Sequence, residues 1–219
     1  MLVQIYEVRT LEEALALARL GIDHIGVLVG GGAFPRELPP AQATAIFAAI
    51  PAGTRRVALS LSTNLREVAQ VVERTRPDIV HIGAAVELLS ADDVRVLKAE
   101  FPDVRIMRSI PIIGPASIEW AKAYEGTADF LLLDSHDPGD RQIGGLGRTH
   151  DWSISRRIVD EVGVPAILAG GLGPDNIGAA IAAVQPAGVD SKTKTDLADG
   201  SGKDLEKVRQ FVAVAKLTS

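Results

Sequence analysis

Short apolar runs alternate along the chain with longer segments in which apolar residues recur every three or four positions. Runs rich in Val, Ile and Leu that end at turn residues predict β-strands, and the longer amphipathic segments predict helices. The predicted strands cover 2–7, 23–29, 56–61, 78–82, 104–109, 129–134, 165–169 and 187–191. The predicted helices cover 10–20, 40–50, 64–75, 90–100, 115–125, 152–162, 174–183 and 202–216. Start signals support two of the helices, since Ser90 precedes an acidic first turn and Pro174 suits a first helical position.

The series of strand–helix pairs predicts the fold. The strands are apolar along their whole length, as strands of a parallel sheet are when both faces are buried. No linker interrupts the series, so we expect an α/β protein with one domain over 1–219, a single (β/α)8 TIM barrel with parallel strands. A doubly wound open sheet is the structural alternative, although no G-x-G-x-x-G turn follows the first strand.

Composition narrows the class of protein. The 219 residues are 47% apolar, which is enough for one large core, and none of them is cysteine. The lack of cysteine excludes disulfides, thiolate metal sites and a cysteine nucleophile. A net charge of −5 without a Lys- or Arg-dense stretch argues against a nucleic-acid partner, and no apolar run is long enough to span a membrane. We therefore expect a soluble, cytoplasmic protein.

Polar residues at the predicted strand ends are the first candidates for chemistry. Asp134 and His136 lie at the end of the sixth strand, His81 lies in the fourth and Arg108 in the fifth. Each has a structural explanation by itself, because a lone Asp can cap a turn and a lone His can be hydrogen-bonded in the core. In a barrel, however, these ends share the rim on which active sites are built. The long loops at 30–39 and 135–151 follow strands and lie on the same rim.

Glycines and lysines near the C-terminus indicate an anion site. Gly170, Gly171 and Gly173 connect the seventh strand to the next helix, and the segment 192–194 (Lys-Thr-Lys) follows the eighth strand. Backbone N–H groups of such a turn can approach a phosphate closely, and the loops after strands seven and eight bind phosphate in many TIM barrels. A tight turn alone would also explain the glycines, but the adjacent lysines favour phosphate.

Several motifs resemble one known family. The stretches FLLLDS (130–135), GGLGRTHDWS (144–153), ILAGGLGPDNIGAAI (167–181), GVD (188–190) and GKDLEKVRQFV (202–212) match it in order and spacing. The N-terminal half matches more loosely, through LEEAL, GIDHIGVLV, FPR and PDIVHIG. The chain resembles the phosphoribosylanthranilate isomerases of tryptophan biosynthesis, which are (β/α)8 barrels. The resemblance implies an intramolecular oxidoreductase that performs an Amadori-type aldose–ketose isomerisation of a phosphorylated sugar derivative, without a metal or another cofactor.

The resemblance also implies roles for individual residues. Asp134 stands at the position of the family's general acid, and a carboxyl group in a barrel mouth can have the raised pKa that proton donation needs. Arg36 stands at the arginine that holds the aromatic carboxylate, and we add Arg108 and His136 as further substrate-binding candidates. The phosphate-binding candidates are Gly145, Gly170, Gly171, Lys192, Thr193 and Lys194.

The first strand departs from the family pattern. The family's catalytic base is a cysteine in a K-I-C-G motif, and here the cysteine is replaced by Tyr6 and the following glycine by Glu7. The candidates for the base are therefore Tyr6, Glu7 and His81. Tyr6 is expected to face the barrel interior, but its ordinary pKa near 10 makes it a poor base. Glu7 has the more suitable pKa, but strand alternation turns it outward unless the backbone bends.

Two other classes of function stay open. The barrel could serve a different reaction on a phosphorylated sugar, either Schiff-base aldolase or lyase chemistry at Lys192 or Lys194, or metal-dependent epimerase chemistry. The metal ligands would then be Glu7, His81, Asp134 and His136. Alternatively the barrel binds a phosphorylated sugar without turning it over. In every case the expected partner is a small phosphorylated sugar, and a homodimer is one option because the family includes monomers and dimers.

Overall fold

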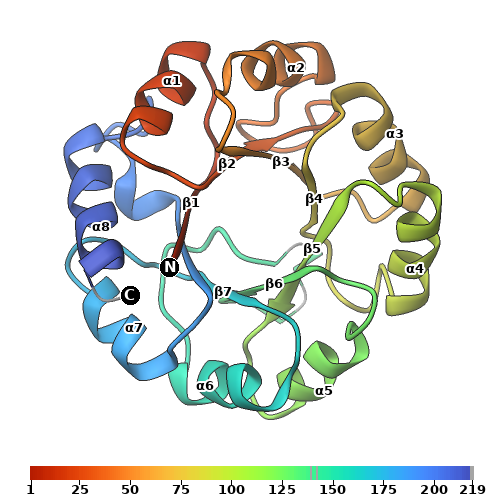
Figure 1. Cartoon of the computed structure of the whole chain (residues 1–219). Helices are drawn as coiled ribbons and strands as arrows, with labels where there is room; N and C mark the ends of the chain where they lie inside the picture. The colour runs from red at the N-terminus through yellow and green to blue at the C-terminus, as the bar shows by residue number, and fades with distance from the viewer. Residues whose placement is uncertain (139, 142, 218–219) are drawn as a thin grey trace.

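The strands form a closed parallel barrel, seen along its axis in Figure 1. The structure, a computed structural model, describes residues 1–138, 140–141 and 143–217. Each strand pairs with the next, and the last pairs with the first. The strands are β1 Leu2–Ile5, β2 His24–Leu28, β3 Arg55–Ser60, β4 Ile79–Ile82, β5 Arg105–Pro111, β6 Phe130–Asp134, β7 Ala166–Leu168 and β8 Gly188–Ser191. The predicted TIM barrel is confirmed.

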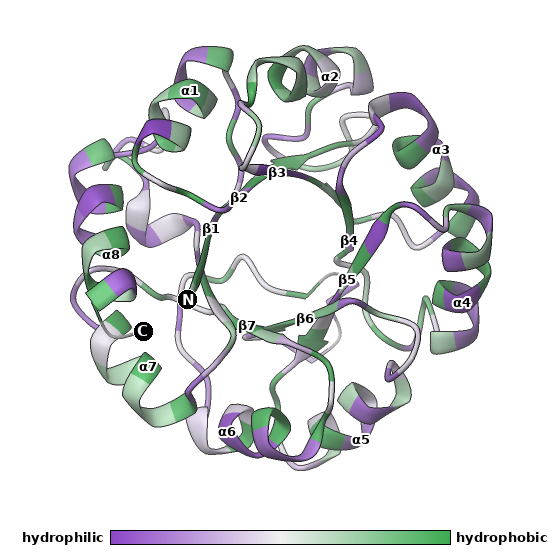
Figure 2. Ribbon diagram, in the orientation of Figure 1, coloured by the Kyte–Doolittle hydropathy of each residue, from purple (hydrophilic) through white to green (hydrophobic). Residues whose placement is uncertain are grey.

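Helices form the outer ring around these strands (Figure 1). They are α1 Leu11–Arg19, α2 Pro40–Ala49, α3 Leu65–Thr75, α4 Ala91–Glu100, α5 Ala116–Ala123, α6 Trp152–Glu161, α7 Ile177–Val184 and α8 Leu205–Leu217, with a short 3-10 helix, η1 Thr193–Thr195. Figure 2 shows mainly hydrophobic strands and helices that carry both hydrophobic and hydrophilic residues. The buried helix residues, such as Leu17, Phe47 and Phe211, belong to the continuous core between helices and barrel.

A second, smaller core fills the barrel interior. Alternation along β1 separates the two cores, because Val3 and Ile5 pack toward the helices whereas Gln4 and Tyr6 reach the interior. The apolar residues of this interior core are Tyr6, Val57, Ile79, Met107, Phe130, Leu132, Ile167 and Ala169. Gln4 adds a buried polar contact, its side-chain oxygen lying 3.0 Å from Nδ1 of His24. The floor of the barrel mouth is thus packed.

Two of the element boundaries that differ from the prediction affect the mouth of the barrel. Helix α7 begins at Ile177, not at Pro174, because the Asn176 side chain closes a turn before it, accepting from the Gly173 N–H (2.9 Å) and donating to the Gly171 carbonyl (3.1 Å). Strand β1 ends at Ile5, two residues before its predicted end. The turn before α7 holds the glycine loop beside the mouth. The early end of β1 leaves Tyr6 and Glu7 outside the regular strand.

Candidate active site

A cavity of about 480 Å³ opens at the carboxyl ends of the strands. Both long loops contribute to it, through Phe34 and Pro35 in one and Ile143 and Leu146 in the other. Its lining includes every predicted site residue except Arg108 and His136, namely Tyr6, Glu7, Arg36, His81, Asp134, Gly145, Gly170, Gly171, Lys192, Thr193 and Lys194. The prediction of one shared rim therefore describes the position of most of these residues.

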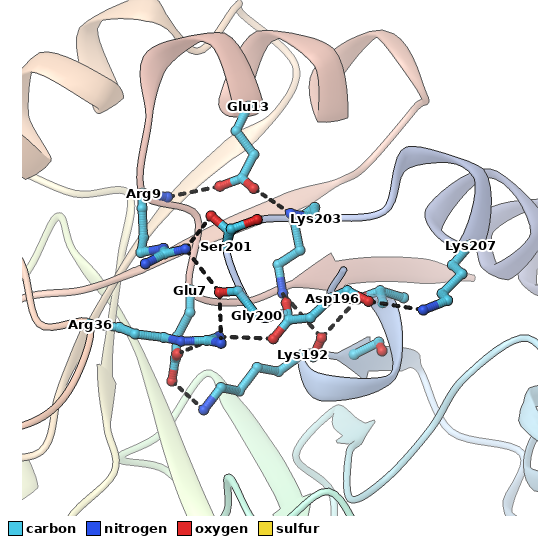
Figure 3. A network of polar contacts seen from close by, with 12 residues as sticks. Glu7, Arg9, Glu13, Arg36, Lys192, Asp196, Gly200, Ser201, Lys203 and Lys207 are labelled. Carbon is cyan, nitrogen blue, oxygen red and sulfur yellow. Dashed lines mark hydrogen bonds and ion pairs between the residues drawn. The ribbon is translucent and has the colours of Figure 1, made fainter. Parts of the chain in front are cut away.

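Glu7 turns into this cavity, against the alternation of the strand that precedes it. Its backbone is left-handed, with φ of 60°, so the side chain leaves the outward direction that follows the inward Tyr6. A left-handed backbone costs a residue with a side chain about 1–3 kcal/mol, and such strain gathers at functional sites. The carboxylate is only 9% exposed and forms two ion pairs, with Lys192 at 2.6 Å and with Arg36 at 3.4 Å (Figure 3).

Tyr6, His81 and Ser109 form a chain of hydrogen bonds at the floor of the cavity. The Tyr6 hydroxyl lies 2.6 Å from Nδ1 of His81, and Nε2 of His81 lies 2.7 Å from the hydroxyl of Ser109. Burial raises the pKa of Tyr6 well above its usual value, and the charge of Asp190 raises it further. Burial lowers the pKa of His81 to about 3, with the Arg108 charge adding to the effect. Both side chains are thus neutral near pH 7, and both ring nitrogens of His81 are occupied, which disfavours either residue as the base.

Two buried carboxyl groups, Asp134 in β6 and Asp190 in β8, also line the mouth. Burial raises the pKa of Asp134 to about 6, against hydrogen bonds from Ser135, whose N–H lies 2.7 Å from Oδ1. Burial and the nearby charge of Asp134 raise the pKa of Asp190 to about 8. Gln4 donates to Asp190 at 3.3 Å. Protonated carboxyl groups are therefore available near neutral pH, as a general acid requires.

Asp190 is a site residue that the sequence analysis missed. It lies in β8 within the GVD motif, two residues before Lys192, and both side chains line the cavity. The alternation of strand residues contained this signal, because Asp190 and Lys192 occupy positions of the same parity. The GVD motif indicates the family, and its aspartate also supplies a carboxyl group that faces the cavity.

Arg36 reaches the cavity, but protein acceptors already surround its guanidinium. Nη1 lies 2.8 Å from Asp196 in addition to its contact with Glu7, and Nη2 donates to the Gly200 carbonyl at 3.1 Å. Asp196 in turn pairs with the buried Lys203 at 2.6 Å, as Figure 3 shows. A ligand carboxylate at Arg36 would therefore share the cation with two carboxylates of the protein.

Lys192 extends toward Glu7 and not only toward the glycine loops. Its ammonium pairs with Glu7, and a Cβ atom placed on Gly145 would lie 3.8 Å from it. Its charge also opposes the rise in the pKa of Asp134. Lys192 is thus a cation that acts on both Glu7 and Asp134. The stem of Lys194 packs against Gly173, where a Cβ atom would approach it to 2.8 Å.

Arg108 does not belong to the site, which corrects the substrate-binding prediction. In β5 the neighbours Met107 and Ser109 point into the barrel, so Arg108 points outward and is fully buried. Its guanidinium donates to the carbonyls of Ile82 (2.9 Å), Ala84 (2.7 Å) and Leu89 (3.2 Å), and lies 5.2 Å from the centre of the Tyr124 ring. Arg108 therefore joins the outside of the barrel to the segment after β4.

His136 is not among the residues that line the cavity. Its Nδ1 atom is buried and has no hydrogen-bond partner among the described residues. The expectation that His136 binds substrate or joins a metal site finds no support in this position. Within residues 1–138, 140–141 and 143–217, no three His, Asp or Glu side chains converge as a metal site would require. The ligand set proposed for an epimerase is therefore not assembled.

Comparisons with known proteins identify the family. The family model of N-(5'-phosphoribosyl)anthranilate isomerase matches residues 8–214. The chain belongs to this family. It is 36% identical over 216 residues to the N-(5'-phosphoribosyl)anthranilate isomerase of Methanocella arvoryzae, covering 99% of this chain and 98% of the relative. The enzyme of that name from Geobacter metallireducens is 36% identical over 217 residues, with 98% of each chain covered.

A solved relative has the same fold over its whole length. The crystal structure of phosphoribosyl anthranilate isomerase from Thermus thermophilus matches with a TM-score of 0.80 and 27% identity, covering 100% of both chains. The predicted family and the predicted enzyme class, an aldose–ketose isomerase, are confirmed. The family match begins directly after Tyr6 and Glu7, the residues in which the first strand departs from the family pattern. Among the described helices, none is long and apolar enough to cross a membrane.

Proposed function

We propose that this protein catalyses the isomerisation of N-(5'-phosphoribosyl)anthranilate in tryptophan biosynthesis, with Asp134 as general acid and Glu7 as base. The observation that carries the proposal is a pair of carboxyl groups on opposite sides of one cavity. Asp134 has a pKa of about 6 and can deliver a proton, whereas Glu7 stands as a carboxylate in two ion pairs. An Amadori rearrangement needs one group of each kind.

The reaction divides into two proton transfers. Asp134 protonates the ring oxygen of the phosphoribosyl group, the bond between C1 and that oxygen breaks, and the open-chain iminium forms. Glu7 then takes the proton from C2, the C–H electron pair forms the C1–C2 double bond, and the iminium electrons return to nitrogen. The resulting enaminol becomes the ketone by gaining a proton at C1 and losing one from the C2 hydroxyl. Substrate and product are isomers, so no other reactant is consumed.

The substrate's two anionic groups have distinct candidates for their binding. The glycine loop after β7 and the segment after β8 supply backbone N–H groups and the Lys194 ammonium for the phosphate. Arg36 supplies a cation for the aromatic carboxylate, shared with Asp196 and Glu7. This sharing predicts that the carboxylate contributes less to affinity here than an unshared arginine would allow.

Neither alternative reaction is favoured by a particular observation. A Schiff-base lysine is activated as a neutral amine in an apolar pocket or beside another cation. Lys192 instead forms an ion pair with Glu7, and Lys194 packs its stem against Gly173. A binding protein without activity would use the same cavity, so it is separated from the enzyme by experiment and not by geometry.

The deciding experiment is turnover of N-(5'-phosphoribosyl)anthranilate by the purified protein in D2O. We expect the ketose product, with deuterium at C1 detected by mass spectrometry. Binding of the reduced, non-reacting product analogue without any turnover of the substrate would instead favour a phosphosugar-binding protein. Absence of both binding and turnover would contradict the proposed substrate.

We further propose that one barrel in the cytoplasm is the functional unit and that its partner is the small phosphorylated substrate. In support, the residues that line the cavity come from elements all around the one barrel. A homodimer stays a prediction, which the mass of the protein in solution measures.

A further inference from the structure

The ion pair between Lys192 and Glu7 joins a departure from the family pattern, Glu7, to the segment after β8. Lys192 is the residue directly after β8, in the segment that continues with the phosphate candidates Thr193 and Lys194. Its ammonium extends from this segment across the mouth to the carboxylate of Glu7, at 2.6 Å (Figure 3). The proposed base is therefore in direct contact with a cation that originates in the proposed phosphate site.

The ion pair with Lys192 opposes proton transfer to Glu7, and in this sense Lys192 covers the base. A carboxylate that accepts a proton from carbon gives up its ion pair, so an ammonium at this distance opposes the transfer. Glu7 and Lys192 are unequal partners, because the Glu7 side chain is 9% exposed and the Lys192 side chain is 27% exposed. Lys192 is therefore the partner that can leave.

A phosphate group is suited to draw Lys192 away. A phosphate monoester carries close to two negative charges near neutral pH, against one on Glu7. The lysine head is a point charge on a flexible four-carbon stem, so it can turn back over its own segment. Glu7 would still be held in the cavity by Arg36, at 3.4 Å. The carboxylate would then keep its position and lose its closest cation.

We propose that Lys192 is a positioning residue that covers Glu7 and is transferred to the substrate's phosphate on binding, so that the base becomes available only beside a phosphorylated ligand. This inference rests on the proposed function, in which Glu7 is the base. It gives a reason why Glu7 and Lys192 occur together in one mouth, since Glu7 is the group that Lys192 covers until phosphate binds. It also directs the binding energy of a remote group to the reacting centre, as enzymes commonly do.

The direct test is a crystal structure of the full chain with inorganic phosphate. We expect phosphate at the loops after β7 and β8, with the Lys192 ammonium on it and more than about 4 Å from Glu7, outside ion-pair distance. Phosphate at these loops with Lys192 still on Glu7 would overturn the transfer of Lys192 and leave the proposed isomerase intact. Absence of phosphate from these loops would overturn the proposed phosphate site and, with it, the transfer.

A kinetic test uses N-ribosylanthranilate, the substrate without its phosphate, with sodium phosphite added separately. In the wild type we expect phosphite to raise kcat/KM at least about tenfold, because the dianion uncovers the base. Lys192→Met should turn over this truncated substrate faster than the wild type without phosphite, and phosphite should change its rate less than about twofold. A Lys192→Met protein that is slower than the wild type on the truncated substrate would overturn the proposal.

A conservative variant separates a covering cation from a merely structural side chain. Lys192→Arg keeps a positive charge beside Glu7, so it should retain the dependence on phosphite. The matched variant Lys194→Met removes a cation of the proposed phosphate site, whereas the described ion pairs of Glu7 are with Lys192 and Arg36. It should weaken the response to phosphite without raising the phosphite-free rate above that of the wild type. If Lys194→Met raised the phosphite-free rate as Lys192→Met is expected to, the specific role of Lys192 would be refuted.

Discussion

Two buried groups of side chains at the barrel mouth are chemically opposite. In the first group, Tyr6, His81 and Ser109 form a neutral chain in which each polar atom of the histidine ring is occupied. In the second group, Asp134 in β6 and Asp190 in β8 have raised pKa values of about 6 and about 8. Tyr6 of the first group stands at the position of the family's cysteine base, and the second group contains the proposed general acid, Asp134.

The difference shows that one physical effect can disable one group and activate another. Burial favours the neutral form of every titratable side chain. For His81 the neutral form is an imidazole with both nitrogens engaged, whereas for Asp134 it is an acid that still holds a proton to donate. Glu7 belongs to neither group, because its left-handed backbone turns the carboxylate toward Lys192 and Arg36.

The largest expected effect comes from removing the acid. Asp134→Asn should lower kcat/KM for N-(5'-phosphoribosyl)anthranilate by about 10²–10⁴, the usual contribution of general acid catalysis, while binding of the reduced product analogue persists. Steady-state kinetics and calorimetric titration measure the two quantities. Asp137→Asn is the control, because Asp137 lies in the loop directly after β6 and pairs with Arg148 at the surface. A loss of less than about tenfold in Asp134→Asn would contradict the assignment.

The pH dependence of kcat/KM distinguishes Asp134 from Asp190 as the proton donor. The acid must be protonated to react, so kcat/KM should fall as pH rises through the pKa of the donor. With Asp134 as donor the fall begins near its pKa of about 6, and with Asp190 it would begin near about 8. A profile of kcat/KM across neutral pH decides between them. A fall that begins only near the higher value would transfer the role to Asp190.

Stability should report the burial of Asp190 independently of activity. Its pKa of about 8 lies above the ordinary value of 3.8, so the folded protein binds this proton more tightly than the unfolded chain. The free energy of unfolding should therefore decrease as pH rises between these two values. Asp190→Asn should lose much of this decrease and be more stable than the wild type at alkaline pH, by about 2 kcal/mol or more. Urea denaturation measures it, with equal stabilities expected only at acidic pH.

The smallest effect on catalysis is expected at Arg108, outside the mouth. Arg108→Met removes the guanidinium donor from three buried carbonyls, of which that of Leu89 still accepts from the Tyr124 hydroxyl, so the free energy of unfolding should fall by about 2–4 kcal/mol. Under conditions in which the variant is folded, kcat should stay within about twofold of the wild type. Denaturation and steady-state kinetics on one preparation measure both. A change in KM with unchanged stability would restore the substrate-binding role.

Sequence patterns predicted much of the architecture and failed where one residue changed the geometry. The barrel and the rim follow from the series of strand–helix pairs, and the inward direction of Tyr6 follows from alternation along the strand. Glu7 could not be placed in this way, because a single φ of 60° reverses the direction of its side chain. The ion pair of Arg36 with Asp196 joins residues far apart in sequence, and only the closure of the barrel brings them together. The prediction that Arg108 binds substrate was wrong because a position near a strand end does not determine which face of the strand the side chain occupies.

The most direct measurement compares C2-proton removal in Glu7→Gln and Tyr6→Phe, followed as deuterium incorporation during turnover in D2O. We expect Glu7→Gln to lose at least about 10² in rate, and Tyr6→Phe to stay within about tenfold of the wild type, because the tyrosine hydroxyl serves the His81 chain and not the substrate. Loss of exchange in Tyr6→Phe together with near wild-type exchange in Glu7→Gln would contradict the assignment of Glu7 as the base.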